Sequence, residues 1–166
     1  MNNVILIGMP TCGKSTIGVL LAKMLGYRFL DSDLLIQEQK GKLLHELIAE
    51  WGAEGFIEIE NEVNKSIQAT RTVIATGGSA VYGKEAMEHL RRMGTVVYLR
   101  IDYATLRARL GDYVHRGVVM PKGYTLQMMF EERTVLYERY ADVTVDTGAG
   151  TELGEVLEQI CKALGQ

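Results

Sequence analysis

Short apolar stretches alternate along the chain with longer segments that have the periodicity of amphipathic helices. Residues 4–7 form a continuous apolar run, which is typical of a strand buried on both faces. Further strand candidates follow at residues 28–30, 72–75, 95–100 and 143–145. Apolar positions recur at helical spacing over residues 15–25, 34–39, 43–50, 53–70, 84–93, 102–110, 126–140 and 153–164. Gly26 and Gly94 are placed to end two of these helices, and Asp102 and Thr151 are candidate N-caps.

The order of these elements predicts the fold class. Five short strands that alternate with helices indicate an α/β protein with a five-stranded parallel sheet. Right-handed crossovers place helices on both faces of such a sheet, which makes three α/β/α layers. Ligands bind beyond the carboxyl ends of the strands, so the candidate site comprises the loops after residues 7, 30, 75 and 100. Residues 111–123 show little periodicity and carry a glycine at each end, which predicts a lid loop that closes over a ligand.

Composition narrows the class of protein. The 166 residues, 47% of them hydrophobic, suit a single domain over residues 1–166. The net charge of −3 does not favour a general nucleic-acid binder. No apolar stretch approaches the ~18 residues of a membrane helix, and the N-terminus lacks the features of a signal peptide. The two cysteines lie far apart, as in proteins of a reducing compartment. We therefore expect a cytoplasmic monomer without nucleic-acid or membrane partners. Trp51, Tyr137 and Tyr140 are expected in the core.

A phosphate-binding loop follows the first strand. Residues 8–15 match the pattern G-x-x-x-x-G-K-[ST] at every fixed position, between a predicted strand and a predicted helix. The backbone N–H groups of such a loop point inward and meet the positive end of the helix dipole. Lys14 would reach the β- and γ-phosphates of ATP from a solvent-open position, and the Ser15 hydroxyl would ligate Mg²⁺. We expect the Cys12 side chain to act only as a small filler of the loop. The residues predicted to bind the nucleotide here are Gly8, Met9, Pro10, Thr11, Cys12, Gly13, Lys14, Ser15 and Thr16.

Further motifs occur in a recognisable order. Asp31-Ser32-Asp33 follows the second strand, and Thr76-Gly77-Gly78 follows the third. Arg109 and Arg116 lie seven residues apart, and the run Arg133-Thr134-Val135-Leu136-Tyr137 precedes Ala141-Asp142. With these motifs the chain resembles, from end to end, the shikimate kinase family of P-loop kinases, whose fold is like that of the nucleoside monophosphate kinases.

The resemblance implies roles for the acidic residues and the glycines. Asp31 would help to hold Mg²⁺ through water, and Asp33 would bind the acceptor hydroxyl, where it would either accept the proton or only orient the group. The alternative for both aspartates is N-capping of the helix that follows. Gly77 and Gly78 would let backbone amides approach the acceptor or the γ-phosphate, or else form only a turn.

The resemblance also implies roles for three arginines. Arg116, in the lid, would stabilise the transferring phosphoryl group, and Arg109 would stack on adenine. A solvated surface position is the alternative for each. Arg133 would bind a carboxylate of the acceptor through a bidentate contact. Its alternative is a structural ion pair with Glu131, Glu132 or Asp142.

The chain departs from the family pattern at residues that would contact the acceptor and in the lid. Where the family carries F-R-x-x-E, Phe56 and Glu60 remain but Ile57 replaces the arginine, which in the family binds the shikimate carboxylate. Glu60 is thereby left without its usual partner and could face a substrate hydroxyl or amine, or repel a carboxylate. Ser79 stands at the family's third glycine, and Val118-Val119 replaces the two leucines of the lid. Phe56, Ile57, Glu60 and Ser79 are expected to contact the acceptor, with residues 33–70 forming the acceptor-binding helices.

Three hypotheses about function follow. The first is ATP- and Mg²⁺-dependent phosphorylation of shikimate at a hydroxyl, with Lys14, Asp33 and Arg116 as catalytic residues. The second is a kinase of the same fold for a gluconate-like or nucleoside-like acceptor, which Ile57 and Ser79 favour. The third is a nucleotide-binding module without catalysis, which the intact phosphate machinery disfavours.

Overall fold

The computed structural model describes residues 2–111 and 118–166. Within these residues the strands are β1 (Asn3–Ile7), β2 (Arg28–Asp31), β3 (Thr72–Ala75), β4 (Gly94–Arg100) and β5 (Val143–Asp146). The helices are α1 (Lys14–Leu25), α2 (Ser32–Lys40), α3 (Leu44–Ser66), α4 (Lys84–Met93), α5 (Tyr103–Leu110), α6 (Leu126–Tyr140) and α7 (Leu153–Ala163), with a short 3₁₀ helix, η1 (Ala80–Tyr82).

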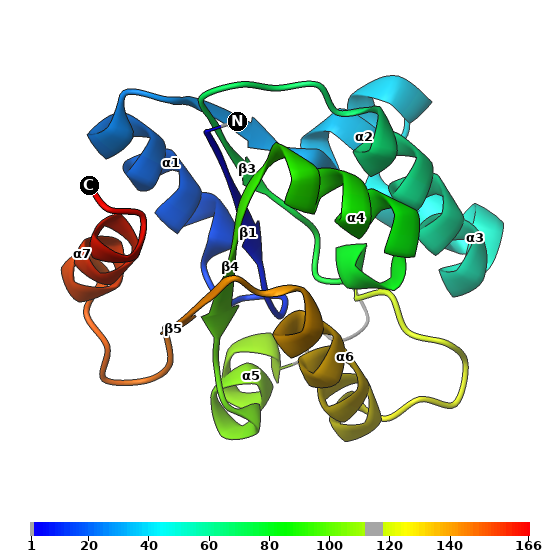
Figure 1. Cartoon of the computed structure of the whole chain (residues 1–166). Coiled ribbons are helices and arrows are strands. Elements are labelled where there is room, and N and C mark those ends of the chain that lie inside the picture. The colour runs from blue at the N-terminus through cyan, green and yellow to red at the C-terminus, as the bar shows by residue number, and fades with distance from the viewer. Residues whose placement is uncertain (1, 112–117) are drawn as a thin grey trace.

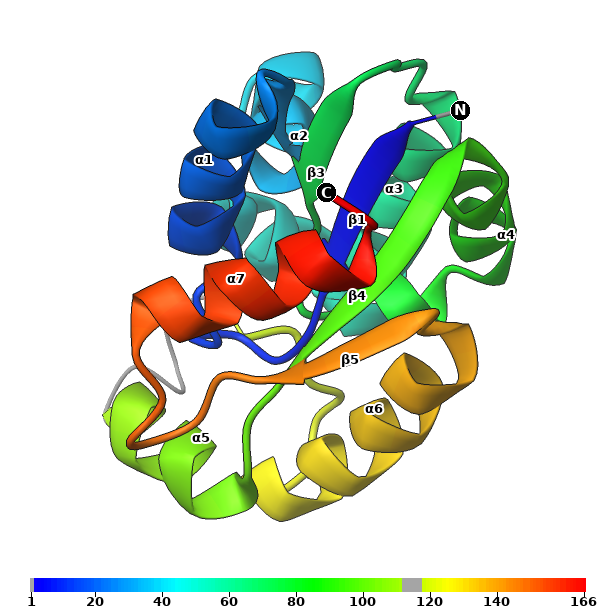
Figure 2. The same cartoon turned by 60° about the vertical axis from the view of Figure 1, so that its left-hand side comes forward.

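The strands form one parallel sheet in the order β2-β3-β1-β4-β5, so the predicted fold class is confirmed. The central strand β1 pairs with β3 through Ile5 and Ile74 and with β4 through Ile5 and Val96. Helices α1 and α7 lie on one face of the sheet, and α3, α4 and α6 lie on the other (Figures 1 and 2). Because β1 is covered on both faces, its apolar run is buried without polar alternation.

Two apolar clusters support this architecture. The larger one surrounds the sheet and contains most of β1, β3 and β4 together with the inward faces of α1, α4, α6 and α7. The smaller one lies between α2 and α3 and is centred on Ile36, Leu47, Phe56, Val63 and Val119. The smaller cluster holds the two helices expected to bind the acceptor against the rest of the domain.

The helix α3 combines two segments that the sequence predicts as separate helices. Gly52 has φ 71° and ψ 179° inside it, a conformation that breaks the helical path and that glycine adopts without a Cβ clash. The predicted division near this residue is therefore confirmed as a kink. The helix ends at Ser66 rather than at the predicted Thr70. The 3₁₀ turn η1 was not predicted, because three residues are too few for a periodic signal.

Several local predictions can be checked directly. The Asp102 side chain accepts a hydrogen bond from the Thr105 backbone N–H, so it caps α5 as predicted. Thr151 as the cap of α7 is wrong: Glu152 holds that position, without a side-chain capping bond. Tyr137 and Tyr140 are buried, but Trp51 is 57% exposed, so its predicted core position is also wrong. Trp51 lies beside the kink of α3 and belongs to neither apolar cluster, whereas Ile48 and Ala53 of the same segment pack on the smaller one. In the part of the chain that the structure describes, we find no helix long and apolar enough to cross a membrane.

Candidate active site

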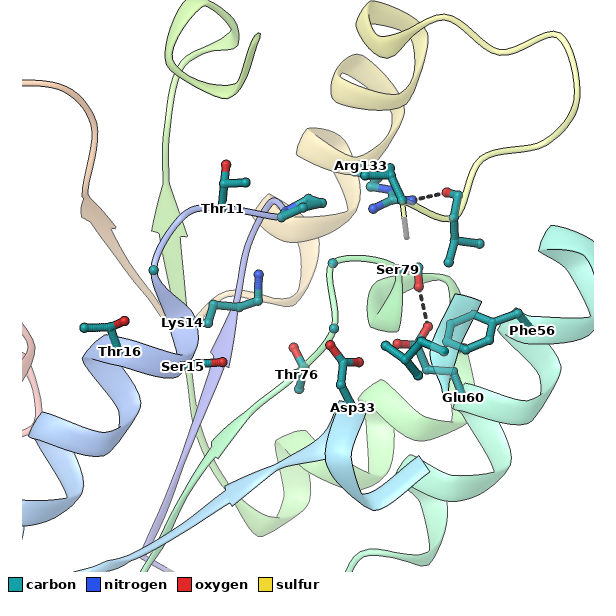
Figure 3. Close-up of a pocket in the computed structure, with 17 residues that line it drawn as sticks. Thr11, Lys14, Ser15, Thr16, Asp33, Phe56, Glu60, Thr76, Ser79 and Arg133 are labelled. Carbon is teal, nitrogen blue, oxygen red and sulfur yellow. Dashed lines mark hydrogen bonds between the residues drawn. The ribbon is translucent and has the colours of Figure 1, made fainter. Parts of the chain in front are cut away.

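A cavity of about 360 Å³ opens at the carboxyl ends of β1, β2 and β3 (Figure 3). The phosphate loop forms one wall, the first turn of α2 and the middle of α3 form another, and the β3–η1 loop and Arg133 of α6 complete it. Its lining residues are Pro10, Thr11, Gly13, Lys14, Ser15, Thr16, Asp33, Leu44, Phe56, Glu60, Thr76, Gly77, Gly78, Ser79, Val118, Val119 and Arg133. The expected position beyond the strand ends is met for the loops after residues 7, 30 and 75, whereas no residue of the loop after residue 100 lines this cavity.

The backbone of the phosphate loop requires its glycines. Gly8 has φ 152°, and a Cβ there would lie 2.6 Å from the Leu99 carbonyl oxygen. Gly13 has φ 94°, and Thr11 also adopts positive φ, at 69°. Gly13 offers no side-chain cap to α1, and the first turn of that helix contains no acidic residue. Neither Gly13 nor the first turn of α1 therefore supplies an anionic side chain to the first backbone N–H groups of the helix. This leaves those N–H groups for a bound anion such as a phosphate.

Lys14 is held inside the loop. Its Nζ donates to the carbonyl oxygens of Gly8 and Met9, each at 2.8 Å, and lies 3.6 Å from Cys12 Sγ. The side chain lines the cavity but is only 9% exposed, so the predicted solvent-open position is wrong. The reason is that loop carbonyls curl around the ammonium group, which they solvate in place of water.

Ser15 and Asp31 meet as the motifs predict. Ser15 Oγ donates to Asp31 Oδ2 at 3.0 Å, while Asp31 Oδ1 accepts from the backbone N–H of Asp33 at 2.9 Å. Asp31 is the N-cap of α2, so capping and proximity to Ser15 occur together. A hydroxyl and a carboxylate oxygen side by side are the donor types that Mg²⁺ prefers. Among the described residues no group of three or more His, Cys, Asp and Glu could hold a metal ion. The pair therefore fits an ion that arrives with the nucleotide phosphates.

Two carboxyl groups enter the cavity from α2 and α3. Burial raises the pKa of Asp33 to about 6, the negative charge of Asp31 adds to this effect, and Lys14 opposes it. Glu60 is 1% exposed. Burial raises its pKa to about 7, against the lowering effect of a hydrogen bond from Ser79. Ser79 Oγ donates to Glu60 Oε1 at 2.5 Å, and Glu60 Oε2 has no partner among the described residues.

The β3–η1 loop brings its backbone against the cavity. A Cβ at Gly77 would lie 2.6 Å from Glu60 Oε2 and 2.7 Å from Asp33 Oδ1, and one at Gly78 would lie 2.8 Å from Pro10 Cδ. The two glycines therefore do more than form a turn, because any side chain would fill the cavity. The Gly78 carbonyl accepts a hydrogen bond from the buried Tyr137 hydroxyl, which fixes the loop to α6.

Arg133 is the cation that α6 contributes. It is 1% exposed, its Nη2 donates to the Val119 carbonyl, and its guanidinium carbon lies 5.4 Å from the centre of the Tyr82 ring. Within the described residues it forms no salt bridge, so the alternative of an ion pair with Glu131, Glu132 or Asp142 is not observed. Arg133 therefore reaches the cavity wall with its charge available to a ligand.

Ile57 is not brought to the cavity wall. It packs on the smaller apolar cluster, and the prediction that it contacts the acceptor is not met in this structure. The reason is helical geometry. Phe56 and Glu60 are four residues apart and share one face of α3, whereas Ile57 is rotated by about 100° from Phe56.

Some predicted nucleotide-binding residues lie elsewhere. Gly8, Met9 and Cys12 do not line the cavity, and the side chains of Met9 and Cys12 pack in the core beneath the loop. The role predicted for Cys12, a small filler, agrees with that position. Arg109 is exposed on the outer side of the loop, where its Nη1 donates to the Thr11 carbonyl at 3.0 Å. Arg116 and the first half of the predicted lid (residues 112–117) lie outside the described residues.

Several residues of the site were not predicted. Leu44 and Thr76 line the cavity, as does the pair Val118 and Val119. Thr76 Oγ1 donates to the Leu6 carbonyl at 2.8 Å and so ties the end of β3 to β1. The only sequence signal for the valines was their place at the two leucines of the family's lid motif. Nothing in the sequence indicated that the Val119 carbonyl would meet an arginine fourteen residues away.

Comparisons with known proteins agree with the motifs. The family model for shikimate kinase matches residues 10–165. A shikimate kinase of Nostoc sp. is 36% identical over 98% of this chain and 90% of its own. One of Thermodesulfovibrio yellowstonii is 34% identical over 98% and 94%. The shikimate kinase of Acinetobacter baumannii, solved in complex with shikimate, superposes with a TM-score of 0.85, at 28% identity over 99% of this chain and 93% of the other. A gluconokinase of Sinorhizobium meliloti, at 18% identity and a TM-score of 0.56, shares only the fold. On these matches and on the phosphate loop at its cavity, the chain belongs to the shikimate kinase family.

Proposed function

We propose that this enzyme transfers the γ-phosphoryl group of ATP to the 3-hydroxyl of shikimate. The observation that carries the proposal is the single cavity in which Lys14, Asp33, Glu60 and Arg133 converge beside the phosphate loop. The volume of about 360 Å³ suits a small ring acid next to the terminal phosphates of a nucleotide.

The bonds, the leaving group and the proton of this reaction can all be accounted for with residues of this chain. The acceptor hydroxyl oxygen forms a bond to the γ-phosphorus as the bond to the β,γ-bridging oxygen breaks, and ADP leaves. The hydroxyl proton passes to the Asp33 carboxylate, which lines the cavity. Lys14, with its ammonium group against the carbonyls of the loop, offsets the charge that develops on the transferring phosphoryl oxygens. Arg116, predicted to act there from the lid, remains a prediction, and so does stacking of Arg109 on adenine.

A Mg²⁺ ion is part of the proposal because the residues present fit it. Ser15 and Asp31 would hold it, directly or through water, and when bound it would neutralise the phosphate charges. The hydrogen bond from Ser15 Oγ to Asp31 Oδ2 orients both groups before any ligand arrives.

Recognition of the acceptor carboxylate is assigned to Arg133. Its guanidinium group is desolvated and has no acidic partner among the described residues, so a bound carboxylate would be its counter-ion. With Ile57 away from the cavity wall, one arginine instead of two would carry this contact.

A second candidate is a kinase of another small acceptor, which the replacement of the family's arginine by Ile57 favours. A coupled ADP-release assay with shikimate, gluconate and nucleosides tests both. We expect turnover with shikimate and little with the others. Turnover with gluconate or a nucleoside only would refute shikimate as the acceptor, and no turnover with any acceptor would favour a nucleotide-binding module.

We further propose that the enzyme acts as a cytoplasmic monomer. Both cysteines are free, as expected in a reducing compartment. Light scattering during gel filtration should report the 18.5 kDa mass of one chain; twice that mass would refute the monomer.

A further inference from the structure

Two positions where the chain departs from the family meet in one hydrogen bond. Ser79, at the family's third glycine, donates to Glu60, the residue that has lost its arginine partner at position 57. The bond holds Oε1 (Figure 3), whereas Oε2 is buried and has no partner within residues 2–111 and 118–166. We propose that Ser79 and Glu60 form an acceptor-recognition pair, in which Ser79 positions the carboxyl group and Oε2 binds the acceptor hydroxyl next to the one that is phosphorylated. This inference rests on the proposed function.

The geometry selects the neighbouring hydroxyl. Glu60 Oε2 and Asp33 Oδ1 both lie close to one point beside the Gly77 backbone, because a Cβ at Gly77 would lie 2.6 Å from the former and 2.7 Å from the latter. Asp33 is the group proposed to contact the reacting hydroxyl. Glu60 Oε2, as a second oxygen close to the same point, would meet the substituent next to that hydroxyl on a small ring. In shikimate phosphorylated at position 3, that substituent is the 4-hydroxyl.

The charge balance selects a hydroxyl over other groups. The charged groups that face Glu60 are Asp33 from α2, Lys14 from α1 and Arg133 from α6, and burial raises its pKa to about 7. Glu60 is therefore present both as the acid and as the carboxylate near neutral pH. The acid can donate from Oε2, and the carboxylate can only accept. A hydroxyl both donates and accepts, so it satisfies Oε2 in either state, whereas a carboxylate or an ammonium group suits only one.

The positioning role of Ser79 follows from the replacement of the family's arginine by Ile57. An arginine at position 57 would lie one turn from Glu60, within reach of its carboxyl group. With isoleucine there, the carboxyl group has no cation on α3 to orient it, and the Ser79 hydroxyl supplies the fixed contact instead. Removing that hydroxyl should free the Glu60 side chain to rotate and weaken the contact to the acceptor.

The test compares shikimate with 4-deoxyshikimate, with 5-deoxyshikimate as the matched control ligand. Dissociation constants from calorimetry and kcat/KM values from ADP release are measured for the wild type, Glu60→Ala, Glu60→Gln, Ser79→Ala and Ser79→Thr. We expect the wild type to bind shikimate about ten- to a hundredfold more tightly than the 4-deoxy compound, as one buried hydrogen bond to an ionisable group would produce. Glu60→Ala should abolish that preference, Ser79→Ala should reduce it, and Glu60→Gln and Ser79→Thr should retain most of it.

The preference for shikimate over 5-deoxyshikimate should be the same in every variant. Thermal melting identifies any variant that does not fold. A preference for shikimate over 4-deoxyshikimate that is unchanged in folded Glu60→Ala would overturn the proposal. The same preference, if Ser79→Ala left it at the wild-type value, would also overturn the proposal.

Measuring binding and ADP release separately distinguishes this inference from the proposed function. Glu60-dependent binding of shikimate without ADP release would refute the function alone, and ADP release without a Glu60-dependent preference would refute the pair alone. No binding of shikimate would refute both.

Discussion

Arg133→Met tests the assignment of the carboxylate contact. Methionine keeps an apolar stem in the buried position but removes the guanidinium group. If a hydrogen bond to a charged partner contributes ~1.5–3 kcal/mol, its loss should raise KM for shikimate roughly ten- to a hundredfold. The turnover number should change less, because the carboxylate is not the reacting group. Steady-state ADP release over a range of shikimate concentrations measures both constants.

The same change also affects stability, so the two effects must be separated. The Val119 carbonyl loses its donor and Tyr82 loses the stacked cation, which together should cost about 1–3 kcal/mol of unfolding free energy. For a chain of this length each kcal/mol lowers Tm by about 2–4 °C, so kinetics should be measured well below the new midpoint. Arg139→Met, at an exposed position of the same helix, is the control and should change neither constant. A KM within twofold of the wild-type value in folded Arg133→Met would show that the carboxylate is held elsewhere.

Three further changes test other parts of the site. Lys14→Ala should lower kcat at least about a hundredfold and should also lower Tm, because the Gly8 and Met9 carbonyls lose their buried donor; normal turnover in the folded variant would remove the kinase assignment. Gly77→Ala should abolish shikimate binding in calorimetry, because its methyl group would meet Glu60 Oε2 at 2.6 Å. Gly154→Ala, whose added methyl group meets nothing within 4 Å, should bind normally and melt slightly higher; equal binding by both variants would refute the cavity geometry. Ile57→Arg should leave kcat/KM for shikimate within about twofold, because residue 57 packs on the smaller apolar cluster and not on the cavity wall; a tenfold increase would show that a longer side chain at this position reaches the acceptor.

The position of the phosphate loop and the need for its glycines could be predicted, because they depend on backbone conformation within eight consecutive residues. The same holds for Asp31, where one side chain caps α2 and meets Ser15. The state of Lys14 could not be predicted in this way. Its burial depends on how closely the Gly8 and Met9 carbonyls curl around the ammonium group, and the spacing of residue types does not contain that distance.

The residues expected to bind the acceptor show more clearly what could not be predicted from the sequence. The motif that ends in Glu60 predicts that Phe56, Ile57 and Glu60 share a function, but only two of them share a helical face. Trp51 was expected in the core because it is large and aromatic, yet it lies 57% exposed beside the kink at Gly52. Hydrophobicity alone does not say which turn of a kinked helix faces the core.

By itself, the sequence determined the alternation of strands and helices, the phosphate loop and the membership of a kinase family. The first two follow from periodicity or from the spacing of neighbouring residues, which local backbone geometry converts directly into structure, and the third follows from the resemblance of the ordered motifs to those of a known family. Only the tertiary structure decided the acceptor site, where Ser79 meets Glu60, Arg133 meets Val119 and Tyr137 meets Gly78. These partners are 14 to 59 residues apart, and their distances are set by the packing of α3, α6 and the β3–η1 loop. Packing of this kind depends on the shapes of all the side chains between the elements, and no short stretch of sequence records it.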